Sequence, residues 1–332
     1  MNLTDKNKYK SDFKKELDKF SDKLEKYVST DDGDWTVKGF IDVYKNIYTI
    51  SSDTKIVSKI LEIHIFPQIL QFADSIGYKI MLAEKQNWYP DLTFVHKQND
   101  EVKFALDLKT TFRRNHNTAG FTLGSHGGYF KEREKEKNIQ FPYSQYLGHY
   151  CLGIIYTRID FADDIAETEI FQVKELQEEY NTPNKKIGER DVTTVQNLKS
   201  ITSVIKDFDF FAAEKWKIAS DKQGSGNTAN IGSIVDIDDL RNGNGIFSKL
   251  GEEWFDEYWI NYGSATMVKD GKPIKITTLK DFLEFKGRTD LWENIVDKTK
   301  KKKESTKKIA VKKLAKKKPA KKSAKKKGGK GK

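Results

Sequence analysis

The stretch YPDLTFVHKQNDEVKFALDLK, residues 89–109, decides the fold expected for this chain of 332 residues. LTFV and KFALDLK are rich in strand-forming residues, and the polar run HKQNDE lies between them, so the pattern predicts a β-hairpin. Asp107 and Lys109 are two residues apart on one strand and therefore share a face. The hairpin is expected to gather charged side chains at one of its ends.

The position of Asp91 depends on the turn. If the turn centres on residues 99–100, Asp91 lies opposite Leu108; if it uses three residues, Asp91 lies opposite Asp107. Either register brings the two carboxylates within about 5–8 Å as cross-strand neighbours. A hard divalent cation such as Mg²⁺ relieves their repulsion, and Lys109 can offset charge on a phosphorus under attack. The set suggests metal-dependent phosphodiester hydrolysis, and a plain salt-bridged strand pair is the alternative.

Helices are expected before the hairpin. An amphipathic stripe predicts one over about residues 10–30, and Ser52 or Asp53 is expected to cap a second, which runs through TKIVSKILEIHIF until Pro67 kinks or breaks it. Further strands are expected at CLGIIYTRI and around KWKIA, while residues 161–205 are hard to assign. Helices and strands together indicate an α/β (α+β) domain. The expected buried residues are Phe13, Leu17, Phe20, Leu24 and Tyr27 on the first helix, and Ile56, Ile60, Ile63 and Leu70 on the second.

The net charge of +11 is concentrated at one end of the chain. Residues 300–332 hold 18 lysines and one glutamate, a sum of +17, and subtracting this from +11 leaves −6 for the other 299 residues. Such a lysine-rich stretch with few apolar residues is expected to be disordered. We therefore expect a domain over residues 1–298 and a disordered tail over 299–332.

Several classes of protein are disfavoured. Cys151 is the only cysteine, so neither an internal disulfide framework nor a cysteine zinc site is expected. No GxxxxGK[ST] phosphate loop is present, and the polar start of the chain lacks the apolar centre of a secretory signal. The sequence has no run of about eighteen apolar residues, so no membrane span is expected. A cytoplasmic protein is expected.

Seven segments, in the same order, resemble type II restriction endonucleases of the PD-(D/E)xK nuclease superfamily. The resemblance runs from about Asp34 to Thr266 and is weaker at 161–205. It implies a restriction-endonuclease-like core with a mixed central β-sheet flanked by helices, working as a homodimer astride double-stranded DNA. The segments are SSDTKIVSKILEIHIFPQI, EKQNWYPDLTF, ALDLKTTF, FTLG, YTR, KWKIASD and GSGNTANIGS.

The resemblance implies four catalytic positions. Asp91 and Asp107 would ligate Mg²⁺, Lys109 would assist the attacking water and stabilise the transition state, and Glu62 would be a further acidic ligand near the metal. From the residues alone, Glu62 belongs to a polar stripe of its helix that an ordinary solvated face explains as well.

DNA-reading loops are implied in the same way. GSGNTANIGS resembles the family's major-groove loop, and residues 85–87 resemble a second loop near the minor groove; glycines permit close approach to base edges, and asparagines both donate and accept hydrogen bonds. Alone, such a string is more often a surface turn. Trp88 and Ala229 depart from the family's pattern and bear on the sequence preference, whereas Ile260 and Ser264 stand where the family has arginines that touch phosphate and bear on the grip on the DNA backbone. The implied DNA-binding residues are Gln86, Asn87, Gly224, Ser225, Gly226, Asn227, Thr228 and Asn230.

The function implied is double-strand cleavage at a short palindrome. GATATC, cut bluntly at its centre, is the suggested site, with 5′-phosphate and 3′-hydroxyl ends, and a cognate DNA methyltransferase would act separately. Two alternatives stay open: a structure-specific or repair nuclease with the same metal site, and a non-enzymatic DNA-packaging protein, which the lysine-rich tail suggests.

Overall fold

The computed structural model describes residues 1–295 except 45, 86, 160–191, 195–202 and 225–228. The chain divides into two compact units, Met1–Thr278 and Leu279–Lys332. In the second unit, helix α6 spans Leu279–Phe285. The lysine-rich stretch lies outside the described residues, so its disorder and the boundary near residue 298 stay predictions.

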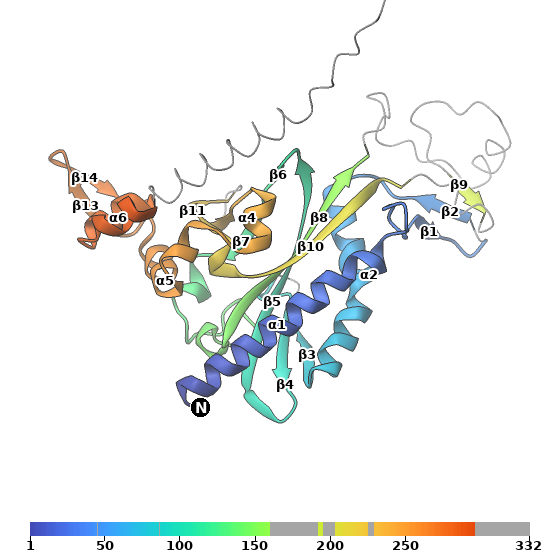
Figure 1. Cartoon of the computed structure of the whole chain (residues 1–332), viewed down its shortest axis with the longest axis horizontal. Helices are drawn as coiled ribbons and strands as arrows, with labels where there is room; N and C mark the ends of the chain where they lie inside the picture. The colour runs from blue at the N-terminus through green and yellow to red at the C-terminus, as the bar shows by residue number, and fades with distance from the viewer. Residues whose placement is uncertain (45, 86, 160–191, 195–202, 225–228, 296–332) are drawn as a thin grey trace, which may run out of the picture. The chain divides into compact units, whose positions relative to one another are not determined.

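A mixed sheet forms the centre of the first unit (Figure 1). Its strand order is β10-β8-β5-β4-β3, and the short β6 also pairs with β5. Strands β5 and β8 run parallel, and the other neighbours are antiparallel. The predicted α/β class is confirmed. The strands are β3 (Tyr78–Leu82), β4 (Leu92–His96), β5 (Asn99–Arg114), β6 (Asn117–Thr118), β8 (Gly148–Arg158) and β10 (Ile205–Glu214).

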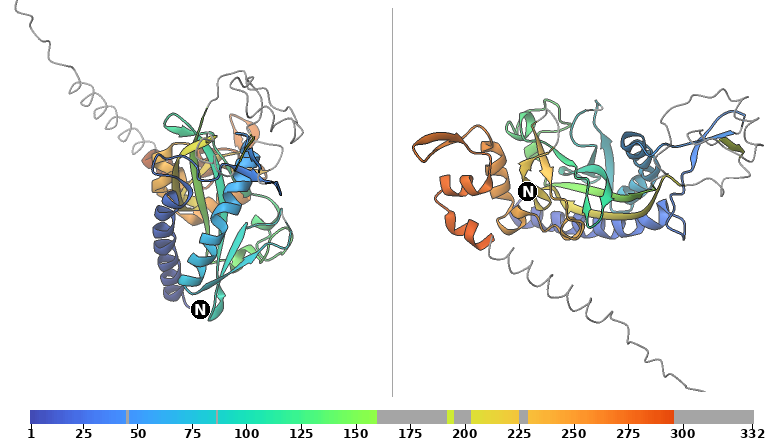
Figure 2. Two further views of the ribbon diagram at one scale, coloured as in Figure 1. Left: turned by 90° about the vertical axis from the view of Figure 1, so that its right-hand side faces the viewer. Right: turned by 90° about the horizontal axis from the view of Figure 1, so that it is seen from above.

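Helices α1 (Leu3–Val28) and α2 (Thr54–Ser75) lie along one side of this sheet (Figure 2). The ring of Phe13 on α1 stacks on Phe104 of β5 with centroids 4.2 Å apart, and Phe20 stacks on Phe72 of α2 at 4.4 Å. The side chain of Asp53 caps α2 by accepting hydrogen bonds from two backbone N–H groups. Both helices share one hydrophobic core with the sheet, which fixes α2 beside β5.

The predicted buried face is largely correct for α1 and largely wrong for α2. On α1 only Tyr27 of the predicted set is exposed, whereas on α2 Ile60 is buried and Ile56, Ile63 and Leu70 are exposed. Because apolar residues occur on several sides of α2, their spacing does not single out one face.

Two further features of α2 differ from a simple reading of its sequence. Pro67 does not end the helix, which continues to Ser75. Although α2 is long and apolar enough to cross a membrane by composition, seven of its residues are buried in the domain: Val57, Ile60, Leu61, Ile65, Ile69, Phe72 and Ala73.

Strand alternation sends different residues of β5 to the two sides of the sheet. Phe104, Leu106 and Leu108 belong to the core shared with the helices, so Asp107 and Lys109 point to the opposite side. On that side, Phe121 packs near Phe211 of β10, with ring centroids 6.5 Å apart. Phe121 directly precedes β7, a strand of a second sheet of order β11-β12-β7. Strand β5 therefore presents its charges toward this second sheet.

The remaining elements complete the fold. KWKIA, expected as a strand, is a 3₁₀ turn, η4 (Lys215–Lys217), followed by β11. The remaining strands and α-helices are β1 (Gly39–Ile41), β2 (Asn46–Thr49), β7 (Thr122–Ser125), β9 (Val192–Thr194), β11 (Ala219–Gln223), β12 (Asn230–Ser233), α4 (Ile237–Asn242), α5 (Glu252–Asn261), β13 (Thr266–Lys269) and β14 (Lys272–Lys275).

Candidate active site

The register of the β4–β5 hairpin places the two aspartates side by side. Leu92 pairs with Leu106, so Asp91 and Asp107 occupy the next position outward on each strand. The backbone N–H of Asp91 donates a hydrogen bond to Oδ1 of Asp107 at 3.3 Å. Of the two registers considered, the structure therefore has the one that sets Asp91 opposite Asp107.

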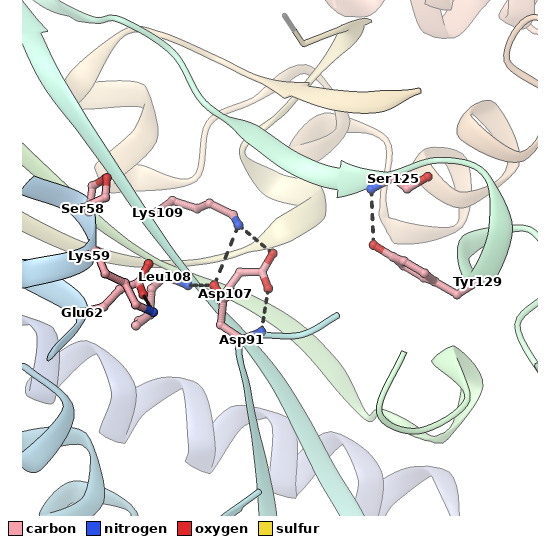
Figure 3. Close-up of polar contacts among 10 residues, drawn as sticks. Ser58, Lys59, Glu62, Asp91, Asp107, Leu108, Lys109, Ser125 and Tyr129 are labelled. Carbon is pink, nitrogen blue, oxygen red and sulfur yellow. Dashed lines mark hydrogen bonds and ion pairs between the residues drawn. The ribbon is translucent and has the colours of Figure 1, made fainter. Parts of the chain in front are cut away.

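Hydrogen bonds and ion pairs hold the three charged groups together (Figure 3). Oδ2 of Asp91 accepts a 2.8 Å hydrogen bond from the backbone N–H of Leu108. The ammonium nitrogen of Lys109 lies 3.1 Å from Oδ2 of Asp107 and 3.9 Å from Oδ2 of Asp91. The Asp91 side chain is 43% exposed and that of Asp107 only 9%, so Asp91 is the carboxylate more open to an incoming phosphate.

The electrostatics of the site reflect two carboxylates competing for one cation. Burial, and then the charge of Asp107, raise the pKa of Asp91 to about 6, against the opposing effects of Lys109 and the Leu108 N–H. Burial lowers the pKa of Lys109, but Asp107 and Asp91 outweigh it and the net shift is upward. The lysine is therefore a firmly protonated cation, whereas the carboxylate pair carries repulsion that a bound divalent cation would relieve.

The donor set fits Mg²⁺. This ion takes one or two carboxylates and fills its remaining positions with water and phosphate oxygens. Asp91 and Asp107 supply two carboxylates, and no group of three or more His, Cys, Asp or Glu side chains suited to a metal occurs among the described residues. Glu62 stands on α2 and forms a 2.8 Å ion pair with Lys59 (Figure 3). The negative charge of Glu62 weakly repels that of Asp91. The role of Glu62 as a metal ligand stays a prediction.

The predicted DNA-reading loop begins and ends on the second sheet. The Gly224 N–H donates to the Asn230 carbonyl at 2.9 Å, and Asn230 pairs with Ser125 of β7. The backbone N–H of His126 donates to the Ala229 carbonyl at 2.8 Å. Asn87 is exposed, four residues before Asp91. Gln86, Ser225, Gly226, Asn227 and Thr228 lie outside the described residues, so their predicted DNA contacts stay predictions.

A layer of stacked aromatic rings around Tyr89 was not predicted. Tyr89, two residues before Asp91, stacks on Tyr129 with centroids 5.1 Å apart, and its hydroxyl lies 2.8 Å from Nδ1 of His149. The ring of His149 stacks in turn on Tyr143 at 3.8 Å. Lys215 is buried against this layer. In the sequence, only Tyr89 of the YPD motif lies near the predicted site. The other rings of the layer come from distant segments, so the sequence alone did not indicate them.

The comparisons with known proteins agree with this geometry. The family model described as Restriction endonuclease EcoRV matches residues 31–182 and 179–287. The chain is 32% identical over 256 residues to the type II restriction enzyme EcoRV of Escherichia coli, and the alignment covers 76% of this chain and 93% of that enzyme. The residues that the family model matches include both aspartates, Lys109 and Glu62.

Proposed function

The chain belongs to the restriction endonuclease EcoRV family and is a type II restriction endonuclease, and we propose that it uses Mg²⁺ to cut both DNA strands at a short palindrome. The observation that carries this proposal is the convergence of Asp91, Asp107 and Lys109 on one end of the β4–β5 hairpin. A cytoplasmic location, where DNA is reached directly, completes the proposal.

Asp91 and Asp107 would hold the Mg²⁺ ion. When bound there, Mg²⁺ supplies charge neutralisation at the scissile phosphate and a more acidic bound water. The Asp91 side chain is oriented by the Leu108 N–H, which leaves its second oxygen for the ion. Lys109, protonated and 3.1 Å from Asp107, stands where it can orient the attacking water and donate to a phosphate oxygen.

Recognition is assigned to the loop between β11 and β12. Asn227, Thr228 and Asn230 offer amide and methyl groups that suit major-groove base edges, and Gln86 and Asn87 suit the minor groove. The loop ends rest on β7, which packs near Tyr89, so base readout and chemistry occupy neighbouring parts of the domain. By similarity to the relative we propose GATATC, cut at its centre into blunt 5′-phosphate and 3′-hydroxyl ends. Ala229 and Trp88 are the positions that bear on this preference.

A homodimer would present two identical loops to two identical half-sites, which is why a palindrome is expected. The β1–β2 hairpin offers a surface for a second copy. Its apolar side chains are widely exposed: Phe40 by 55%, Ile41 by 60%, Val43 by 88% and Tyr44 by 75%. An apolar patch of this kind on a water-facing hairpin is typical of an interaction surface.

Digestion of plasmid DNA of known sequence with Mg²⁺ tests the proposal. A plasmid with one GATATC site should become linear, with blunt ends that DNA ligase rejoins, while a plasmid without the site stays circular. Asp107→Asn is the matched negative control. Discrete bands at another sequence would correct the site alone. A smear or cutting confined to branched DNA would favour the structure-specific nuclease, and binding without cleavage would favour the packaging protein.

A further inference from the structure

Lys215, the first residue of η4, is a buried cation that no hydrogen bond among the described residues satisfies. Its residue is 3% exposed, and its ammonium nitrogen makes no hydrogen bond within the described part of the chain. Lys109, by contrast, is paired with both aspartates. Burying an ammonium group without an acceptor costs free energy, so its neighbours must compensate by other means.

The compensation comes from an aromatic cage. The Lys215 nitrogen lies 5.0 Å from the ring centroid of Tyr89, 5.5 Å from that of Phe130 and 5.7 Å from that of Tyr143. Each ring face attracts a cation. Gly124 of β7 closes the cage, because a Cβ atom there would come within 3.6 Å of the same nitrogen and 3.0 Å of the Tyr129 hydroxyl. The charge is thus held in a defined place beside Tyr89, two residues before Asp91.

The two charged groups with the largest effect on Lys215 belong to the candidate site. Asp107 gives the strongest attraction, followed by a repulsion from Lys109; Asp256 on α5 attracts it and Arg133 repels it. Asp91, Asp107 and Lys109 together carry a formal charge of −1, and Lys215 brings this group to zero. Asp256 balances the charge of Lys215 less than Asp107 does. The carboxylate of Asp256 is already paired with Arg133, at a distance of 2.6 Å.

We propose that Lys215 is the buried counter-charge of the Asp91–Asp107 site, a positioning residue that balances the carboxylates in the metal-free enzyme and sets how tightly they hold Mg²⁺. The inference rests on the proposed metal site. A fixed positive charge near the carboxylates opposes a second cation bound to them, so the metal affinity of the free enzyme is lower than two carboxylates alone would give.

Lys215→Met tests this with the metal alone. Methionine fills the aromatic cage without charge. Lys217→Met is the matched control, because Lys217 lies in the same turn but pairs with Glu214 at the surface. Calorimetric titration of the DNA-free protein with Mg²⁺ or Mn²⁺ at pH 7 should show affinity rising roughly fivefold or more in the first variant and unchanged in the second. Parental affinity in Lys215→Met would overturn the proposal.

A pH series separates an electrostatic role from a structural one. Burial lowers the pKa of Lys215 to about 8, so its charge is lost as pH rises from 7 to 9. Parental metal affinity should therefore rise over that range. The shifted neighbours do not compete: the pKa of Asp91 is about 6, that of His149 is well below its usual value, and those of Lys109 and the tyrosines of the layer are raised.

The parent and two variants then give three profiles of metal affinity against pH. The parent rises with pH, Lys215→Met is tight and flat, and Lys215→Arg, with a permanent charge, is weak and flat. The arginine variant carries the test if the methionine variant does not fold, as judged by circular dichroism. Identical pH dependence in the parent and the arginine variant would overturn the inference. Asp91→Asn distinguishes this failure from failure of the proposed function. If metal binding survives in Asp91→Asn, the proposed metal site is itself wrong.

Discussion

The backbone N–H of Leu108 donates a 2.8 Å hydrogen bond to the carboxylate of Asp91 across the hairpin. The bond ties the side chain that precedes β4 to the strand that carries Asp107 and Lys109. Because Leu108 points into the core while its N–H points along the sheet, packing of the core also fixes Asp91. The placement of Asp91 beside Asp107 thus depends on the hairpin register.

Asp91→Asn and Asp107→Asn should each slow cleavage by roughly a thousandfold or more, because a neutral amide is a poor ligand for Mg²⁺. The fold should survive, since the amide oxygen introduced by Asp91→Asn can still accept the hydrogen bond from Leu108. Single-turnover cleavage of a one-site duplex and thermal unfolding measure the two effects. Near-parental cleavage in either variant would remove that carboxylate from the metal site.

Cleavage should fail on the acid side near pH 6. The pKa of Asp91 is raised to about 6, so the carboxyl is neutral below that pH and ionised above it. Metal and proton compete for the same oxygens, and more Mg²⁺ should therefore move the midpoint to lower pH. Rates measured from pH 5 to 8 at two Mg²⁺ concentrations check this. A midpoint of the pH–rate profile that does not move with Mg²⁺ concentration would mean that another group controls the loss of activity at low pH.

Glu62→Gln should slow cleavage much less than Asp91→Asn, by about tenfold. Glu62 is paired with Lys59 on α2 rather than with the carboxylate pair, so we expect it to contribute less to holding the metal than Asp91 and Asp107 do. Lys59→Met is the control for loss of the ion pair. A defect as deep as that of Asp91→Asn would show that Glu62 ligates the metal directly.

His126 and Gln223 should act as one unit in supporting the DNA-reading loop. The Gln223 amide nitrogen lies 2.7 Å from Nε2 of His126, and burial, followed by Lys131, lowers the pKa of that ring, so at pH 7 a neutral ring nitrogen can accept from the amide. His126→Phe keeps an aromatic ring against Trp259 and Tyr262, which lie 5.1 Å away.

His126→Phe and Gln223→Ala should each slow cleavage of the cognate site by roughly five- to thirtyfold, and the double variant should be no slower than the worse single one. Non-specific DNA binding should change little. The measurement is a double-mutant cycle on single-turnover rates. Fully additive effects would show that the two side chains act independently.

Val43→Lys should weaken self-association. Val43 is 88% exposed on the β1–β2 hairpin among other apolar side chains, and a lysine there would have to lose its hydration in an interface. Sedimentation velocity should show a dimer for the parent and a larger monomer fraction for the variant. Lys97→Ala on the β4–β5 turn is the control. An unchanged dimer would place the interface elsewhere.

The charged triad was predictable because it is local in sequence. Asp107 and Lys109 share a face by strand alternation, and the structure decided only which of two registers brings Asp91 beside them. Strand β10 was not predicted, since its start lies in the polar stretch 161–205 and IKDFDFF mixes charge with aromatics. Nothing marks Lys215 among the many lysines, because its cage is built by residues up to 126 positions away: Tyr89, Phe130 and Tyr143.

The β4–β5 pairing shifts register between Val95 and His96, where His96 pairs with Asn99 although Val95 pairs with Lys103. Val102, one of the extra residues of the bulge, is fully buried, and four regular pairs separate the tip at Lys97 and Gln98 from the end that carries Asp91 and Asp107. Inserting or deleting a residue inside the bulge would shift the strand register at Asp107. A change at the tip would leave that register unaltered. The tip is therefore the natural attachment point for a fluorophore or a surface tether, by which single enzyme molecules could be watched travelling along DNA with their chemistry intact.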